Sequence, residues 1–135
     1  MVTSFIRHGD RILLLRRSKK VGTYKGRWAG VSGYLEEPTP LAQALKEINE
    51  ETGLTESQVT LVSSGKSLEV FDQKLGFSWL VHPFLFETGV PEKIRLDWEH
   101  VDMQWVEPAA LRQLPTVPKL AEAYERCLHE DEAEK

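Results

Sequence analysis

The segment formed by residues 39–54 constrains the fold most, because it carries both a helix start signal and a helix stop signal. Thr39 is a suitable N-cap, and Pro40 fits the first helical position, where a missing N–H costs nothing. Gly53 fits the left-handed position just past a helix C-terminus. Apolar residues recur between these signals at helical spacing, so the sequence predicts an amphipathic helix. They are Leu41, Ala44, Leu45 and Ile48.

A group of glutamates falls on one face of this predicted helix. Glu47, Glu50 and Glu51 occupy positions i, i+3 and i+4, so their side chains converge and their charges repel. A helix that keeps such a group either exposes it to water or uses it to bind a cation. From these residues alone a solvated face is the commoner explanation, and Lys46 could soften the repulsion by pairing with Glu50. Both interpretations stay open at this point.

The residues around the glutamates resemble the signature of the Nudix hydrolases. That pattern is a Gly, five residues, a Glu, seven residues, and then Arg-Glu-aliphatic-any-Glu-Glu-any-Gly-aliphatic. The run of residues 33–54 begins with the Gly. Its second half matches at Glu47, Ile48, Glu50, Glu51, Gly53 and Leu54. A motif of this length and spacing is far more specific than a pair of glycines.

Two positions depart from the family pattern. Lys46 stands where the family has Arg, which replaces a rigid fork with a flexible point charge. Gly33 and Glu47 are one position closer together than the pattern requires, so Glu36 or Glu37 must replace the early Glu. We prefer Glu37, because it directly precedes the Pro-Thr-Pro start of the helix. The residues expected to support the motif are therefore Gly33, Glu37, Lys46 and Gly53.

The resemblance implies a metal-dependent reaction on phosphorus. Carboxylates are hard oxygen donors that suit Mg²⁺, or Mn²⁺, rather than zinc. By this match Glu47, Glu50 and Glu51 are the metal ligands, and the catalytic group is Glu50, Glu51 and Glu99. A magnesium ion held by carboxylates keeps positions for water and phosphate oxygens, and it lowers the pKa of bound water. The implied activity is hydrolysis, by attack of water on phosphorus, of the pyrophosphate bond in a nucleoside diphosphate linked to another group.

The motif does not fix the general base. Glu99 lies in the run Asp97-Trp98-Glu99-His100, from which it could reach the metal cluster and activate water, or serve as an added ligand. His100 could instead contact phosphate. Glu69 is a weaker rival as the base, since a strand could also point it into the cleft.

One basic neighbourhood, within residues 16–27, is a candidate phosphate clamp. The alternative is that these loop Lys and Arg side chains are simply solvated. The better candidates lie at strand edges rather than in the middle of the loop. They are Arg16, Arg17 and Arg27.

Length and composition predict one soluble domain over residues 1–135, with a frayed charged tail over 130–135. At 135 residues, 41% hydrophobic and 28% charged, the chain can bury a core. A net charge of −4 argues against bulk nucleic-acid binding. The lone Cys127 cannot form an internal disulfide, and no apolar run is long enough to span a membrane. We therefore expect a cytoplasmic protein with no membrane partner. The resemblance implies a small nucleotide diphosphate derivative as partner and is compatible with a homodimer.

Short apolar runs predict strands on both sides of the helix. Residues 2–7 and 11–17 flank His8-Gly9-Asp10 and predict a hairpin, and the continuous apolar run 12–15 predicts a strand covered on both faces. Interleaved strands and helices fit a mixed sheet between helical layers, and the resemblance specifies an α/β/α sandwich. Further strands are predicted at 28–33, 59–64, 67–71, 79–86 and 101–106. A short helix is predicted at 109–114, followed by a final helix with apolar Leu120, Ala121, Ala123, Tyr124 and Leu128.

Other classes of function remain beside the hydrolase. A binding or sensor module that kept the fold and lost turnover would not need all of Glu47, Glu50 and Glu51. An isomerase of a diphosphate-bearing isoprenoid, known among relatives of this kind, would need a proton donor opposite the metal, and Cys127 in the last predicted helix is poorly placed for it. The sequence leaves the nucleotide open.

Overall fold

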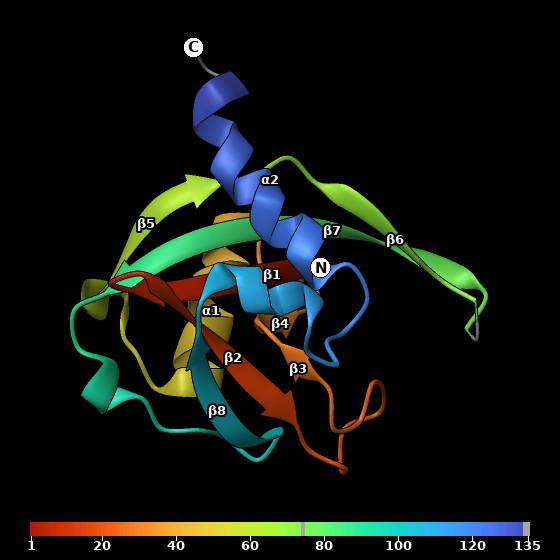
Figure 1. Ribbon diagram of the computed structural model, residues 1–135, viewed down its shortest axis with the longest axis horizontal. Coiled ribbons are helices and arrows are strands. Elements are labelled where there is room, and N and C mark those ends of the chain that lie inside the picture. Colours follow the sequence, from red (N-terminus) through yellow and green to blue (C-terminus); the bar gives the residue numbers. More distant parts are fainter. Residues whose placement is uncertain (74, 134–135) are drawn as a thin grey trace.

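The computed structural model describes residues 1–73 and 75–133, with the side chains of 129–133 left out. It is an α/β/α sandwich in which helix α1 (Pro40–Thr52) lies behind a mixed sheet and helix α2 (Leu120–Ala133) crosses in front of it (Figure 1). The strand order is β3-β2-β1-β7-β5, with β4 joined to β1, β8 to β2 and β6 to β7. The strands are β1 (Val2–His8), β2 (Arg11–Arg17), β3 (Trp28–Ala29), β4 (Val31–Gly33), β5 (Val59–Ser64), β6 (Leu68–Asp72), β7 (Phe77–Thr88) and β8 (His100–Val106). The predicted fold class is confirmed.

Two hydrophobic cores lie on opposite faces of the sheet. Successive strand residues point to opposite faces, so β2 sends Leu14 toward the core under α2 and Leu15 toward the core under α1. Strand β1 does the same with Phe5 and Ile6. Each fully buried side chain of this size contributes about 1.5–3 kcal/mol to folding. The predicted strand at 12–15, covered on both faces, is confirmed.

Strand β1 is the organising strand of the sheet. It pairs antiparallel with β2, where His8 lies opposite Arg11, and the two-residue turn between them places Gly9 at a φ of 63°. It also pairs antiparallel with β4 and parallel with β7. Pairing with β4 sets Gly33 opposite Val2, which brings the end of β4 beside α1.

The capping signals of α1 act as the sequence predicts. Thr39 Oγ1 accepts from the Ala42 N–H at 3.1 Å, and Gly53 has a φ of 78° and donates its N–H to the Asn49 carbonyl at 2.9 Å. Ala44 and Ile48 are fully buried against the sheet, whereas Leu41 is 37% exposed. The helix therefore has a fixed register on the sheet, which decides where its glutamates point.

Three sequence-based expectations are corrected. The predicted strand at 28–33 is two strands, because β3 pairs with β2 whereas β4 pairs with β1, and the chain passes from one partner to the other at Gly30. The short helix predicted at 109–114 is a 3₁₀ segment, η3 (Pro108–Arg112), which begins at a proline and ends after one tight turn or so. Leu128 is 47% exposed, and Cys127 takes the core position. Helix α2 extends to Ala133, and residues 134 and 135 of the predicted tail lie outside the described residues.

Two further 3₁₀ segments, η1 (Glu56–Gln58) and η2 (Pro91–Lys93), connect the larger elements. Within residues 1–73 and 75–133, no helix has the length and apolar character needed to cross a membrane.

Candidate active site

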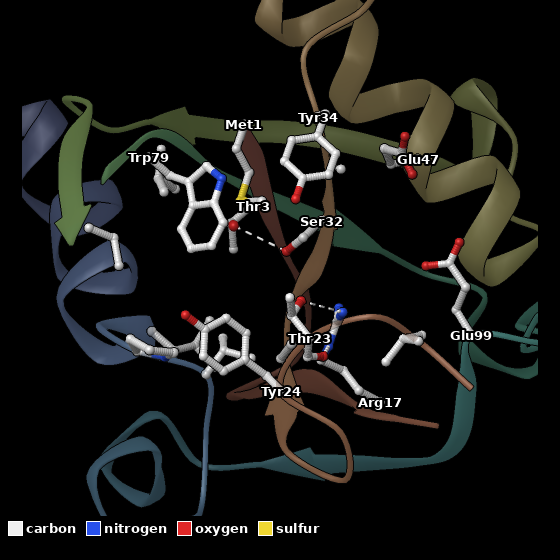
Figure 2. A pocket seen from close by; sticks show the side chains of 18 of the residues that line it. Met1, Thr3, Arg17, Thr23, Tyr24, Ser32, Tyr34, Glu47, Trp79 and Glu99 are labelled. Atoms are coloured by element: carbon white, nitrogen blue, oxygen red, sulfur yellow. Dashed lines mark hydrogen bonds between the residues drawn. The ribbon is translucent and has the colours of Figure 1, made fainter. Parts of the chain in front are cut away.

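A cavity of about 580 Å³ lies between α1, the loop after β2 and the β6–β7 hairpin. Glu47 and Glu99 stand at one end of it, and Tyr24 and Trp79 stand at the other (Figure 2). Arg17 projects from the end of β2 into the space between. The cavity thus has an acidic end, a cationic flank and an aromatic end.

The acidic end is built on a pair of carboxylates that interact with each other. Glu51 is only 2% exposed and lies behind the cavity wall, while Glu47 is partly buried and lines the wall. Burial raises the pKa of Glu47, and it raises the pKa of Glu51 well above its usual range, with the Glu47 carboxylate adding to the second effect. Two ionised carboxylates repel each other, so a proton or a bound cation would stabilise this pair. A solvated helix face is therefore excluded for Glu51.

One oxygen of this pair has no hydrogen-bond partner. Among the described residues, Glu51 Oε2 is buried and accepts no hydrogen bond. A buried oxygen without a partner carries an uncompensated desolvation cost. A bound ligand that contacts the oxygen would offset this cost. The orphaned oxygen is the clearest sign that this end of the cavity takes a ligand.

Two further carboxylates act on the same point. Glu50 is exposed and lines the cavity, and its charge adds to the raised pKa of Glu47. Glu99 also lines the cavity, and its charge adds to the raised pKa of both Glu47 and Glu51. Glu69, the weaker rival, is exposed on the hairpin opposite Leu80 and is not part of the lining.

His100 lies behind the carboxylates. Its side chain is 1% exposed, its Nδ1 donates to Asp97 Oδ1 at 2.9 Å, and its Nε2 lies 3.5 Å from Glu51 Oε1. It is not part of the cavity lining. The expectation that His100 contacts phosphate is wrong, because both ring nitrogens already face carboxylates.

Gln43 is a site residue that sequence reasoning missed. It is 1% exposed, and its Nε2 donates to Glu47 Oε1 at 2.8 Å. Its Oε1 accepts from the backbone N–H groups of Glu36, at 2.8 Å, and Glu37, at 2.9 Å. Gln43 thus joins the loop before α1 to the Glu47 carboxylate. The signal that could have found it is its position one helical turn before Glu47.

The remaining motif positions cluster around this loop. Lys46 Nζ lies 3.5 Å from Glu37 Oε1, and both side chains are more than a third exposed, so the pair contributes little stability. Glu36, the other candidate for the early Glu of the motif, lines the cavity, whereas Glu37 does not. Gly33 lines the cavity beside Glu47, and Gly53 ends α1.

Only one of the three predicted phosphate arginines lines the cavity. The Arg17 guanidinium is held by the Thr23 carbonyl at 2.9 Å and by Thr23 Oγ1 at 3.3 Å. Arg16 and Arg27 lie outside the lining and donate to the carbonyls of Gly26, at 3.2 Å, and Thr116, at 3.1 Å. Three lysines, one from the same basic neighbourhood and two from other parts of the chain, also line the cavity. They are Lys20, Lys46 and Lys119.

A partly buried hydrogen bond holds the aromatic end together. The Tyr24 hydroxyl donates to Asp72 Oδ2, and the Tyr24 and Trp79 ring centroids are 6.4 Å apart. Burial, followed by the bond to Asp72, raises the pKa of Tyr24 to about 12. Tyr24 holds a φ of 49°, an uncommon conformation for a residue with a side chain. This contact ties the loop after β2 to the β6–β7 hairpin across the cavity.

The donors at the acidic end fit a hard divalent cation by chemistry. They are all carboxylate oxygens, which Mg²⁺ and Mn²⁺ prefer, and one of them lacks any partner. Within the described chain, no three His, Cys, Asp or Glu side chains are already arranged to hold an ion. A bound ion would therefore need a side chain such as Glu50 to turn toward the Glu47–Glu51 pair.

The family model for the NUDIX domain matches residues 2–127. The chain belongs to this family.

Solved structures of Nudix proteins share its fold. A MutT protein from Methanosarcina mazei Go1 is 25% identical, with a TM-score of 0.72 over 96% of this chain and 92% of that one. The E. coli dihydroneopterin triphosphate pyrophosphohydrolase has a TM-score of 0.76 at 21% identity, over 92% of this chain and 90% of that one. A C. elegans Ap4A hydrolase, in a binary complex, has a TM-score of 0.73 at 19% identity, over 99% and 96%. At these lower identities the likeness concerns the fold. Comparison with the curated proteins gave no match.

Proposed function

We propose that this protein is a metal-dependent hydrolase that cleaves the pyrophosphate bond of a small nucleotide derivative. The observation that carries the proposal is the pair of Glu47, which lines the end of the cavity, and buried Glu51 behind it, whose Oε2 has no partner among the described residues. The same cavity also holds cationic side chains. Family membership supports the same reaction class. The solved relatives named for pyrophosphohydrolase and Ap4A hydrolase activity are compatible with it.

In this proposal Glu47, Glu50 and Glu51 hold Mg²⁺ or Mn²⁺. When bound, such an ion polarises the phosphoryl group and lowers the pKa of a coordinated water. The charge of the bound ion would also offset the repulsion between the carboxylates of Glu47 and Glu51. The cation and the protein's acidic end are therefore complementary in charge.

The other cavity residues have roles that follow from their positions. Arg17, held by Thr23, is placed to bind phosphate oxygens between the two ends of the cavity. Glu99 is the proposed general base, since a carboxylate at the cavity edge near the ion can take a proton from water. Tyr24 and Trp79 offer flat apolar surface to the remainder of the substrate.

The test is a panel of diphosphate compounds assayed for release of phosphate or nucleoside monophosphate with Mg²⁺. We expect turnover by the native protein and loss of most turnover in Glu50→Gln and Glu51→Gln. Glu69→Gln is the matched control, because it removes an exposed carboxylate outside the cavity, and it should keep full activity. Full activity in Glu50→Gln or Glu51→Gln would contradict the metal assignment.

A pH–rate profile tests the role of Glu99. Glu99→Gln should fall sharply in rate or lose the pH dependence that a titrating base gives. Tight nucleotide binding without turnover in the native protein would favour the alternative, a Nudix-fold binding or sensor module. Cys127 is buried in the core under α2 and does not line the cavity, so no thiol supports an isomerase.

A further inference from the structure

His100 joins the strand β8 side of the site to a proposed metal ligand on α1. It is the first residue of β8, and its backbone follows directly from Glu99 at the cavity edge. Its ring fills the space between Asp97 and Glu51, with all but 1% of the side chain buried. The proposed roles in ion binding, phosphate binding and catalysis do not involve this buried histidine.

The contacts of the ring fix its orientation. A carboxylate can only accept, so Nδ1 carries the proton that it donates to Asp97 Oδ1 at 2.9 Å. With Nδ1 anchored, Nε2 points at Glu51 Oε1, 3.5 Å away, and a proton on Nε2 or on the Glu51 carboxyl makes this contact attractive. Of the two Glu51 oxygens, Oε1 therefore faces histidine and Oε2 is the one without a partner.

We propose that His100, held by Asp97, is a positioning residue that orients the Glu51 carboxylate so that Oε2 is available to a divalent cation. This inference rests on the proposed function and adds to it a residue outside the helix motif. Buried carboxylates that bind metals depend on such outer partners for their orientation, and loss of the partner costs about 10–100-fold in metal affinity. Because His100 does not line the cavity, replacing it should change the affinity for the ion rather than direct contact with a substrate.

Two substitutions separate the two contacts of the ring. The amide of Gln in His100→Gln extends as far as Nε2, so it can keep the contact with Glu51. The amide of Asn in His100→Asn reaches only as far as Nδ1, so it can keep the contact with Asp97 and loses Glu51. If orientation of Glu51 is the function, Gln retains ion affinity better than Asn. If His100 only fills space, the two variants bind the ion equally.

The experiment measures Mn²⁺ binding by electron paramagnetic resonance, with the ion alone and no nucleotide present. We expect His100→Asn to weaken Mn²⁺ binding about 10–100-fold and His100→Gln to restore a large part of the loss. Asp97→Ala should weaken binding by a smaller factor, because the ring remains and only its anchor is lost. Asp102→Ala is the control: it removes an exposed carboxylate from the same strand, and Mn²⁺ affinity should be unchanged.

Denaturant unfolding of each variant shows that the folded protein is being titrated. If His100→Asn does not fold, the comparison of Asp97→Ala with Asp102→Ala still decides the matter. If His100→Asn binds Mn²⁺ as tightly as the native protein, this inference is overturned and the proposed function stays intact. If His100→Asn does not fold, native-like Mn²⁺ affinity in Asp97→Ala has the same meaning. Failure of the native protein to bind Mn²⁺ at all overturns both.

Discussion

The backbone of Gly33 packs directly against the carboxylate of Glu47. A Cβ added to Gly33 would lie 2.3 Å from Glu47 Cδ and 2.4 Å from its Oε1, and Cβ atoms in folded proteins essentially never make non-bonded contacts this short. The absence of a side chain at the end of β4 is thus what allows Glu47 to reach its place at the acidic end of the cavity.

Gly33→Ala should therefore impair ion binding more than stability. The obstructing atoms belong to the end of a flexible side chain, so Glu47 can swing away at little cost to the fold. We expect Mg²⁺-dependent turnover to fall at least about tenfold, as expected for a displaced ligand partner, with a small change in the urea midpoint. Gly89→Ala is the control, because no atom lies within 4 Å of the added Cβ there. Equal activity in the two variants would contradict the role of Gly33.

The raised pKa of Glu51 should make the metal-free protein less stable as pH rises. Its pKa is raised in the folded state, chiefly by burial, so the folded protein holds the proton more tightly than the unfolded chain does. The resulting stability is fully present below the pKa of an unfolded Glu and is lost as pH rises through the folded pKa.

Glu51→Gln should accordingly stabilise the metal-free protein at neutral pH. The neutral amide avoids the buried charge, and we expect a gain on the order of 1 kcal/mol, seen as a few degrees in Tm. The gain should disappear near pH 4, where the native carboxyl is protonated. Thermal unfolding at both pH values, with chelator present, measures it; a variant less stable than the native protein at pH 8 would contradict this account. Such a gain on removing a functional group is typical of an active site.

Gln43→Ala should destabilise the loop before α1. It leaves the N–H groups of Glu36 and Glu37 without their acceptor and Glu47 without its donor. Buried groups that lose a partner cost roughly 1–3 kcal/mol, which urea unfolding resolves. Gln113→Ala, at an exposed position, should be close to neutral. A Gln43→Ala protein as stable as this control would mean that water replaces the amide fully.

Tyr24 should ionise late in an alkaline titration. Its pKa of about 12 arises from burial and from the Asp72 carboxylate, which accepts its hydrogen bond. The stability from the raised pKa is present below pH 10 and is lost as pH rises through 12. The difference in absorbance at 295 nm between the native protein and Tyr24→Phe isolates this phenol. In Asp72→Asn the same phenol should ionise at lower pH; an unchanged midpoint would show that Asp72 does not act on it.

The parts of the structure that depend on interactions between neighbouring residues could be predicted from the sequence. The N-cap Thr39, Pro40 and the left-handed Gly53 define α1 from neighbouring residues alone, so the helix and its glutamates were predictable. Glu99 was a candidate because it lies just before a predicted strand and because the family resemblance points to a Glu in this part of the chain, and in the structure it lines the cavity.

Contacts between distant segments were not predictable in this way. The break of the strand at Gly30 depends on pairing with two different strands, β2 and β1, which the sequence pattern around Gly30 does not show. The place of His100 behind Glu51 likewise depends on a contact between the first residue of β8 and a residue of α1 far away in the sequence. Arg16 and Arg17 are identical in type and adjacent, and only the twist and register of β2 decide that Arg17 faces the cavity.

The parallel pairing of β1 with β7 has a consequence for biosynthesis. Residues 2–7 of the nascent chain must wait for residues 82–87 before that side of the strand is hydrogen-bonded. Until then, a strand rich in apolar side chains presents a bare edge to other chains leaving neighbouring ribosomes. A chain truncated before residue 82 therefore lacks the partner of β1 and is prone to aggregate, even though the hairpin and the acidic helix are already complete.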